Sequence, residues 1–192
     1  MKVKLSLTRG RTIVLASLLL LALLAITLYP YISFPIRSIN YLGVNMNFRA
    51  NLRDAKDVLV YPNEELVREE IMNQFIENIT IVFKPGEDNV NSHYVLEVFE
   101  IVNKLAIAYK LRFAYIPNFN VVNVTSYENI RGTKDNPIIA LIHPIYSNET
   151  VVKIEDHVIY IQGNNARNSM GQLKNFDLAT VKFLMVALDI KI

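Results

Sequence analysis

The chain has 192 residues, with 20 basic and 18 acidic side chains, and it contains no cysteine. The lack of cysteine excludes disulfide frameworks, thiolate metal sites, covalent haem attachment and cysteine nucleophiles. The length leaves room for one membrane segment and one domain of ordinary size, which can bury a core without such supports.

The charges are unevenly distributed along the chain. Four of the 20 basic side chains precede residue 12, which leaves 16 basic against 18 acidic side chains in the rest. The four are Lys2, Lys4, Arg9 and Arg11. A nearly neutral domain with scattered charges lacks the basic footprint of a protein that binds DNA or RNA. We therefore expect no nucleic-acid partner.

An apolar segment of 23 residues without any charge extends over residues 12–34. About 20 helical residues suffice to cross the hydrocarbon core of a membrane. A secretory leader usually has a shorter apolar stretch followed by small residues, whereas Tyr29, Tyr31 and Phe34 suit the boundary between membrane and water. The sequence therefore predicts an uncleaved transmembrane helix at 12–34, with a cleaved leader as an alternative.

The residues on either side of this segment predict its orientation. Basic residues precede it, whereas Arg37 is the only basic residue among the dozen that follow. Because cytoplasmic flanks carry the excess of Lys and Arg, residues 1–11 are expected in the cytoplasm. Residues 36–192 then form an extracytoplasmic domain of a single-pass protein in the cell membrane.

The beginning of the apolar segment supports a second alternative. Arg9-Gly10-Arg11 followed by an apolar helix resembles the leader of type IV pilins. The resemblance implies cleavage after Gly10 and packing of the helix into a filament core.

Three asparagines lie in N-x-[ST] sequons on the predicted outer side, namely Asn78, Asn123 and Asn148. Asn78 introduces an expected buried strand, which is a poor place for a glycan. Asn123 and Asn148 lie in loop-like stretches and are the candidate glycosylation sites.

The domain over 36–192 shows strand and helix patterns in alternation. Asn63 is the expected cap of the first helix. The expected order is strand 42–48, strand 57–62, helix 63–78, strand 79–83, helix 92–110, strand 112–117, an irregular stretch 118–136, strand 137–144, a hairpin of strands 150–154 and 157–162, and a final helix 175–190. Glu155-Asp156 is the expected turn of that hairpin.

Two of these helices carry apolar residues at helical spacing, which predicts the sides that face the core. The expected core positions of the helix over 92–110 are 94, 95, 98, 101, 102, 105, 106 and 109, and those of the final helix are 176, 179, 183, 184, 187 and 188.

Apolar strands that alternate with helices indicate an α/β domain. The sequence predicts one N-terminal transmembrane helix followed by a single three-layer domain, which has a mostly parallel sheet, helices on both faces and a C-terminal hairpin plus helix.

Prolines follow four of the expected strands, at Pro62, Pro85, Pro117 and Pro144. Proline commonly ends a strand. In open parallel sheets, however, ligands bind beyond the carboxyl ends of the strands, and these prolines would mark that edge. The candidate ligand-binding residues in the loops there are Glu64, Lys84, Asp88 and His143.

No pattern of catalysis or cofactor binding is present. The sequence lacks the glycine-rich nucleotide motifs, G-x-S-x-G, S-x-x-K and H-E-x-x-H. We therefore expect no catalytic residue, metal or cofactor, and favour a non-catalytic accessory or partner-binding subunit of a cell-envelope assembly. The alternatives are an enzyme or small-ligand binder that uses the carboxyl-end loops, and a pilin-like filament subunit.

Overall fold

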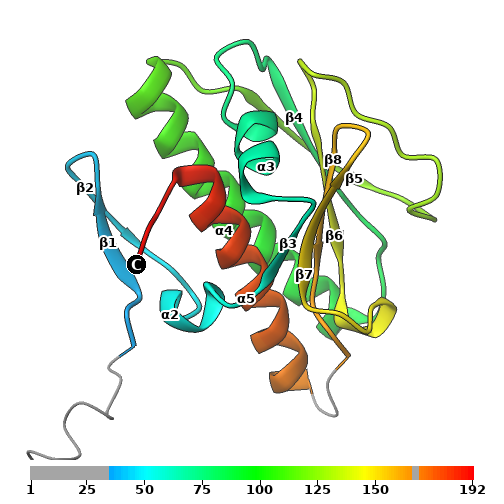
Figure 1. The fold of residues 1–192 in the computed structure, drawn as a ribbon. Coiled ribbons are helices and arrows are strands. Elements are labelled where there is room, and N and C mark those ends of the chain that lie inside the picture. Colours follow the sequence, from blue (N-terminus) through cyan, green and yellow to red (C-terminus); the bar gives the residue numbers. More distant parts are fainter. Residues whose placement is uncertain (1–34, 166–168) are drawn as a thin grey trace, which may run out of the picture. The chain divides into compact units, whose positions relative to one another are not determined.

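The computed structural model describes residues 35–165 and 169–192 (Figure 1). The predicted transmembrane helix at 12–34 and the pilin-like pattern around Gly10 lie outside the described residues. Within the described ranges, no helix combines the length and the apolar character needed to cross a membrane.

The domain begins with a hairpin and then alternates strands and helices. The elements are β1 (Ser38–Tyr41), β2 (Val44–Asn47), α2 (Leu52–Ala55), β3 (Leu59–Tyr61), α3 (Glu64–Ile71), β4 (Asn78–Phe83), α4 (Asp88–Phe113), β5 (Asn118–Asn123), β6 (Ile138–Ile142), the 3-10 turn η2 (Pro144–Tyr146), β7 (Val151–Glu155), β8 (Val158–Gln162) and α5 (Ser169–Leu188).

The described residues form a six-stranded sheet in the order β3-β7-β8-β6-β4-β5, apart from the β1–β2 hairpin. Four of its pairings are parallel, and β7 pairs with β8 antiparallel. The predicted α/β class with a mostly parallel sheet is confirmed. Because β7 turns back on β8, strands β3 and β7 run against the other four.

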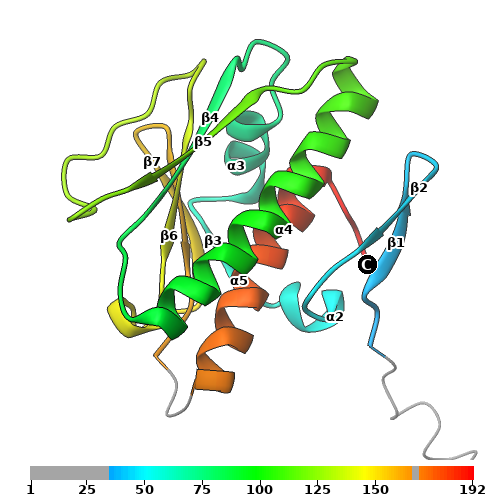
Figure 2. The same ribbon diagram turned by 180° about the vertical axis from the view of Figure 1, so that it is seen from behind.

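The helices do not cover both faces of the sheet as predicted. Helices α3, α4 and α5 lie together on one face (Figures 1 and 2). On the other face, Tyr127 and its neighbours in the segment 124–137 pack against Val82 of β4 and Ala140 of β6. That segment lacks the apolar periodicity of a helix, so it covers this face of the sheet as irregular chain. Among the described elements, the domain therefore has no helical layer on this face.

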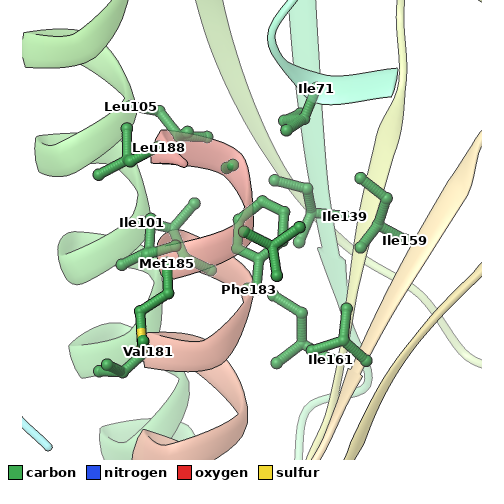
Figure 3. Packing of buried hydrophobic residues seen from close by; sticks show 14 of the residues in the cluster. Ile71, Ile101, Leu105, Ile139, Ile159, Ile161, Val181, Phe183, Met185 and Leu188 are labelled. Carbon is green, nitrogen blue, oxygen red and sulfur yellow. The ribbon is translucent and has the colours of Figure 1, made fainter. Parts of the chain in front are cut away.

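The helical face holds the main core. Alternate residues of the central strands point to it, and Figure 3 shows Ile139, Ile159 and Ile161 around Phe183 of α5. Each large apolar side chain buried in this way stabilises the fold by roughly 1.5–3 kcal/mol. All six predicted core positions of α5 are buried, so its stripe is confirmed.

One expected strand is wrong, and another is confirmed only in part, as β2. The predicted strand 112–117 is wrong, because α4 continues to Phe113 and ends where Ala114 adopts a left-handed conformation with φ of 63°. Strand β5 then begins at Asn118, inside the stretch expected to be irregular. The expected strand 42–48 contains the tight turn of the β1–β2 hairpin, where Gly43 has φ of 89° and its N–H donates to Asn40 Oδ1 at 3.0 Å.

The C-terminal hairpin is confirmed with its turn one residue later than predicted. Glu155 pairs with Val158, so the turn residues are Asp156 and His157, with φ of 47° and 61°. Gly163 follows β8 and lies so close to α5 that a Cβ would stand 2.8 Å from the backbone nitrogen of Phe176. Any larger residue there would push β8 and α5 apart.

Candidate functional site

The prolines that were expected to mark one edge of the sheet lie in three different settings. Pro85 and Pro144 follow β4 and β6, which are parallel neighbours, so they lie at the same edge. Pro62 follows β3, which runs the other way, and Pro117 precedes β5. The reversal of β3 therefore separates Glu64 from the other candidate ligand-binding residues.

Glu64 begins α3 and has a partner of its own. Its carboxylate lies 2.7 Å from Nζ of Lys182 on α5. The same Nζ donates to the carbonyl of Lys56 at 2.8 Å. The carboxylate of Glu64 thus neutralises a buried lysine and ties α3 to α5.

His143 lies at the carboxyl end of β6 with its ring fully buried. Its Nδ1 accepts the N–H of Ile145 at 3.2 Å, so its Nε2 carries the proton and donates to Nδ1 of His93 at 2.7 Å. The two rings stack with their centroids 5.0 Å apart. Burial lowers the pKa of His143 to about 4 and also lowers the pKa of His93. Both rings are therefore neutral near pH 7, and they cap η2 and join it to α4.

Lys84 and Asp88 lie at the same edge as His143. The Nζ of Lys84 stands 4.8 Å from the centroid of the Tyr146 ring, and Asp88 is exposed in the first turn of α4. A carboxylate there is stabilised by the helix dipole. In the described part of the chain, no three histidine or acidic side chains come together as metal ligands.

The candidate glycosylation sites are both accessible. Asn123 ends the edge strand β5, not a loop, and Asn148 lies in the loop between η2 and β7. Both side chains are exposed, whereas Asn78 is half-buried at the start of β4. Glycosylation of Asn123 and Asn148 stays a prediction.

A row of polar side chains on α4 is buried although the sequence placed none of them in the core. This polar row consists of His93, Glu97, Glu100 and Lys104. It faces Asp177 on α5, which binds Arg49 from the segment after β2 through an Nε to Oδ1 distance of 2.9 Å. The spacing of these four residues on one side of a helix was the available signal, but it also fits a solvated face.

Glu97 is the most unusual member of the polar row. It is fully buried, and neither carboxylate oxygen has a hydrogen-bond partner of ordinary geometry. Burial raises its pKa well above the usual range, and the neighbouring Asp177 raises it further. Burial also raises the pKa of Glu100, although Lys104, at 3.9 Å, opposes that shift. The cluster therefore favours a proton on Glu97 over a second negative charge beside Asp177.

The side of α4 opposite the polar row forms an apolar groove with the edge strand β5. Figure 2 shows where α4 and β5 lie. This α4–β5 groove has a volume of about 460 Å³. Its lining residues are all apolar, namely Phe83, Val95, Val98, Phe99, Val102, Phe119 and Val121. Phe99 is 69% exposed and Val95 66% exposed, although Val95 was an expected core position.

Two larger hollows contain charged side chains, and each of them includes one ion pair. The first, of about 730 Å³, lies on the helix-free face of the sheet, where Lys153 binds Glu149 at 2.6 Å. The second, of about 500 Å³, contains His157, whose Nδ1 lies 2.9 Å from Glu70.

The α4–β5 groove differs from both of these hollows, because its lining offers a partner apolar surface and no charge.

A scan against protein-family models, a search of curated proteins and a search of solved structures each found no match to this chain.

Proposed function

We propose that residues 36–192 form a non-catalytic protein-docking domain and that the α4–β5 groove is its docking surface. The observation that carries this proposal is the exposure of Phe99 and Val95 in a hollow whose lining contains no polar side chain. Contiguous exposed apolar surface of this kind commonly marks an interaction site.

The energetics of the groove support docking over simple exposure. Covering one large side chain such as Phe99 contributes roughly 1.5–3 kcal/mol to binding before the costs of association. Aromatic residues in apolar pockets are also the usual anchors of protein interfaces. A partner that fills the groove removes apolar area from water on two elements at once, because α4 and β5 both line it.

The apolar segment at 12–34 suggests where this docking takes place. Its length and the basic residues before it support a membrane anchor with the domain on the outer side. We therefore place the protein as an accessory subunit of a cell-envelope assembly. A ligand-binding function would instead depend on Lys84 and Asp88, and a pilin-like function would depend on cleavage after Gly10.

The test replaces Phe99 with glutamate in the full chain, in its native membranes. Phe99→Glu should release the protein from its assembly, because a charge in the apolar groove cannot be desolvated cheaply. Phe75→Glu is the matched control, since Phe75 is equally exposed at 69% but lies outside the groove. The measurement is the size of the detergent-extracted complex that contains each variant.

The opposite result is equally specific. If Phe99→Glu stays in a complex of the wild-type size while Lys84→Ala/Asp88→Ala abolishes function, the docking proposal is wrong. The function then belongs to the carboxyl edge of β4 and β6.

A further inference from the structure

The groove is bounded by a strand edge that no other described element covers. Strand β5 pairs with β4 on one side, and the N–H groups of Asn118 and Val124 donate toward β4, each at 2.9 Å. The backbone N–H and C=O groups of successive strand residues point to opposite edges of the strand. Those of Phe119, Val121 and Asn123 therefore point away from β4. Between residues 118 and 123 there is no proline or charged side chain, which are the usual protections of such an edge.

The side chains beside this edge specify what could pair with it. Phe119 and Val121 point into the groove, and Val95 and Phe99 line it from α4. An extended segment laid along β5 would satisfy the outward backbone groups, and every second side chain of that segment would enter the groove. The side chains that this segment places in the groove must therefore be apolar and uncharged.

Strand β5 itself meets this description. Its sequence, NFNVVN, has Phe119 and Val121 on the groove side, and neither strand nor groove carries a charged side chain. Two identical copies therefore meet without like-charge repulsion, which is destabilising between facing strand residues.

We propose that the occupant of the groove is a second copy of this chain, joined antiparallel through β5 about a two-fold axis at Asn120. This inference rests on the proposed docking function and names its partner. In this register, Phe119 of one copy lies opposite Val121 of the other, and their outward N–H and C=O groups pair. A shift of one step, with Val121 on the axis, would set Phe119 against Asn123 and lose the apolar match.

Two-fold pairing also fits the layers of the domain. An axis perpendicular to the sheet keeps both helical layers on the same side, so the two copies of Phe99 flank the joined strands. The six-stranded sheets then become one continuous sheet without the exposed edge at β5.

The absence of cysteine allows a direct test by single-cysteine cross-linking in membranes. Residues on the axis form a non-hydrogen-bonded pair with Cα atoms about 4.5 Å apart. This lies within the range of about 4.4–6.8 Å that a disulfide requires. Asn120→Cys in the full chain should therefore give a covalent dimer on mild oxidation.

Asn118→Cys is the control, because Asn118 is exposed on the same strand and the same face. In the proposed register its two copies lie roughly four strand steps apart, or about 13 Å. We expect roughly tenfold more covalent dimer from Asn120→Cys, because Cα atoms more than about 7 Å apart cannot be bridged without backbone movement.

The other outcomes separate the inference from the function that it builds on. Equal cross-linking at 118 and 120 would show random collision and overturn the two-fold register. If neither cysteine yields dimer while Phe99→Glu still leaves the assembly, the second copy is wrong and a different protein occupies the groove. If neither cysteine yields dimer and Phe99→Glu stays in the assembly, both proposals fail.

Discussion

Two sides of α4 depart from the pattern of the usual amphipathic helix. The side against α5 buries the polar row, including the unpartnered carboxyl group of Glu97, while the side against β5 leaves Phe99 and Val95 in contact with water. An ordinary surface helix turns its apolar side inward and its polar side outward. Both departures cost free energy in the isolated domain, and only the exposed side can recover that cost by binding.

The contribution of the buried side of α4 to the free energy of unfolding should depend on pH, unlike that of the exposed side. Glu97 gives the largest expected effect. Because burial raises its pKa, folded Glu97 keeps a proton that the unfolded chain releases above the usual glutamate range. The free energy of unfolding should then fall as the pH rises, by up to about 1.4 kcal/mol per unit. Glu97→Gln cannot release a proton and should remove this slope.

Urea denaturation of residues 36–192 at a series of pH values above the usual glutamate range measures this difference. Glu65→Gln is the control, since the Glu65 side chain is 72% exposed on α3. Parallel pH curves for wild type and Glu97→Gln would show that Glu97 is ionised in the folded domain. The comparison between the two sides of α4 would then lose its strongest element.

The histidine pair should respond to pH in the opposite direction. His143 has its pKa lowered to about 4. The stability that depends on its neutral ring is complete above the unfolded value of about 6.5 and is lost as the pH falls toward 4. Integrated over that window, the loss amounts to as much as about 3 kcal/mol.

His143→Asn tests this expectation, because asparagine keeps an acceptor for the N–H of Ile145 but does not titrate. Between about pH 6.5 and pH 4 the wild type should lose free energy of unfolding relative to this variant, because only the wild type can protonate the His143 ring. The measurement is again urea denaturation, with each curve normalised at pH 8, above the window of about 4–6.5. A variant curve that declines with the wild type would assign the acid sensitivity to other groups.

The smallest effect is expected on the exposed side. Phe99→Ser should change the free energy of unfolding by less than about 0.5 kcal/mol, because the side chain loses little packing. Leu105→Ala on the buried side should cost about 2–5 kcal/mol by leaving a cavity. Thermal unfolding of both variants compares the two sides. A loss at Phe99 close to that at Leu105 would mean that the groove is part of the core.

The sequence predicts α5 better than α4 for a physical reason. The apolar stripe of α5 is single, and all six of its positions are buried. The apolar residues of α4 surround more than one side of the helix, so periodicity alone cannot choose the buried arc. The buried arc includes the polar row, which faces Asp177. Asp177 in turn pairs with Arg49 across 128 positions of sequence, so this contact leaves no local signal.

The prediction of the candidate site was partly wrong for the same reason, because it also depends on contacts between residues far apart in the chain. Lys84, Asp88 and His143 lie at one edge because β4 and β6 are parallel, as expected. Glu64 lies elsewhere because the pairing of β3 with β7 reverses its direction, and that pairing joins residues far apart in the chain. The α4 side of the groove was missed because an exposed valine or phenylalanine on a helix looks identical in sequence to a buried one.

The position of α5 has a consequence for the order in which the domain can form. It packs against α2, α3, α4, β7, β8 and η2, so it lies at the centre of the helical layer, yet it comes last among the described elements. During synthesis, at about 5–20 residues per second, the strands emerge before the helix that covers them. Ile139, Ile159 and Ile161 therefore lack their packing partner Phe183 until α5 has been synthesised.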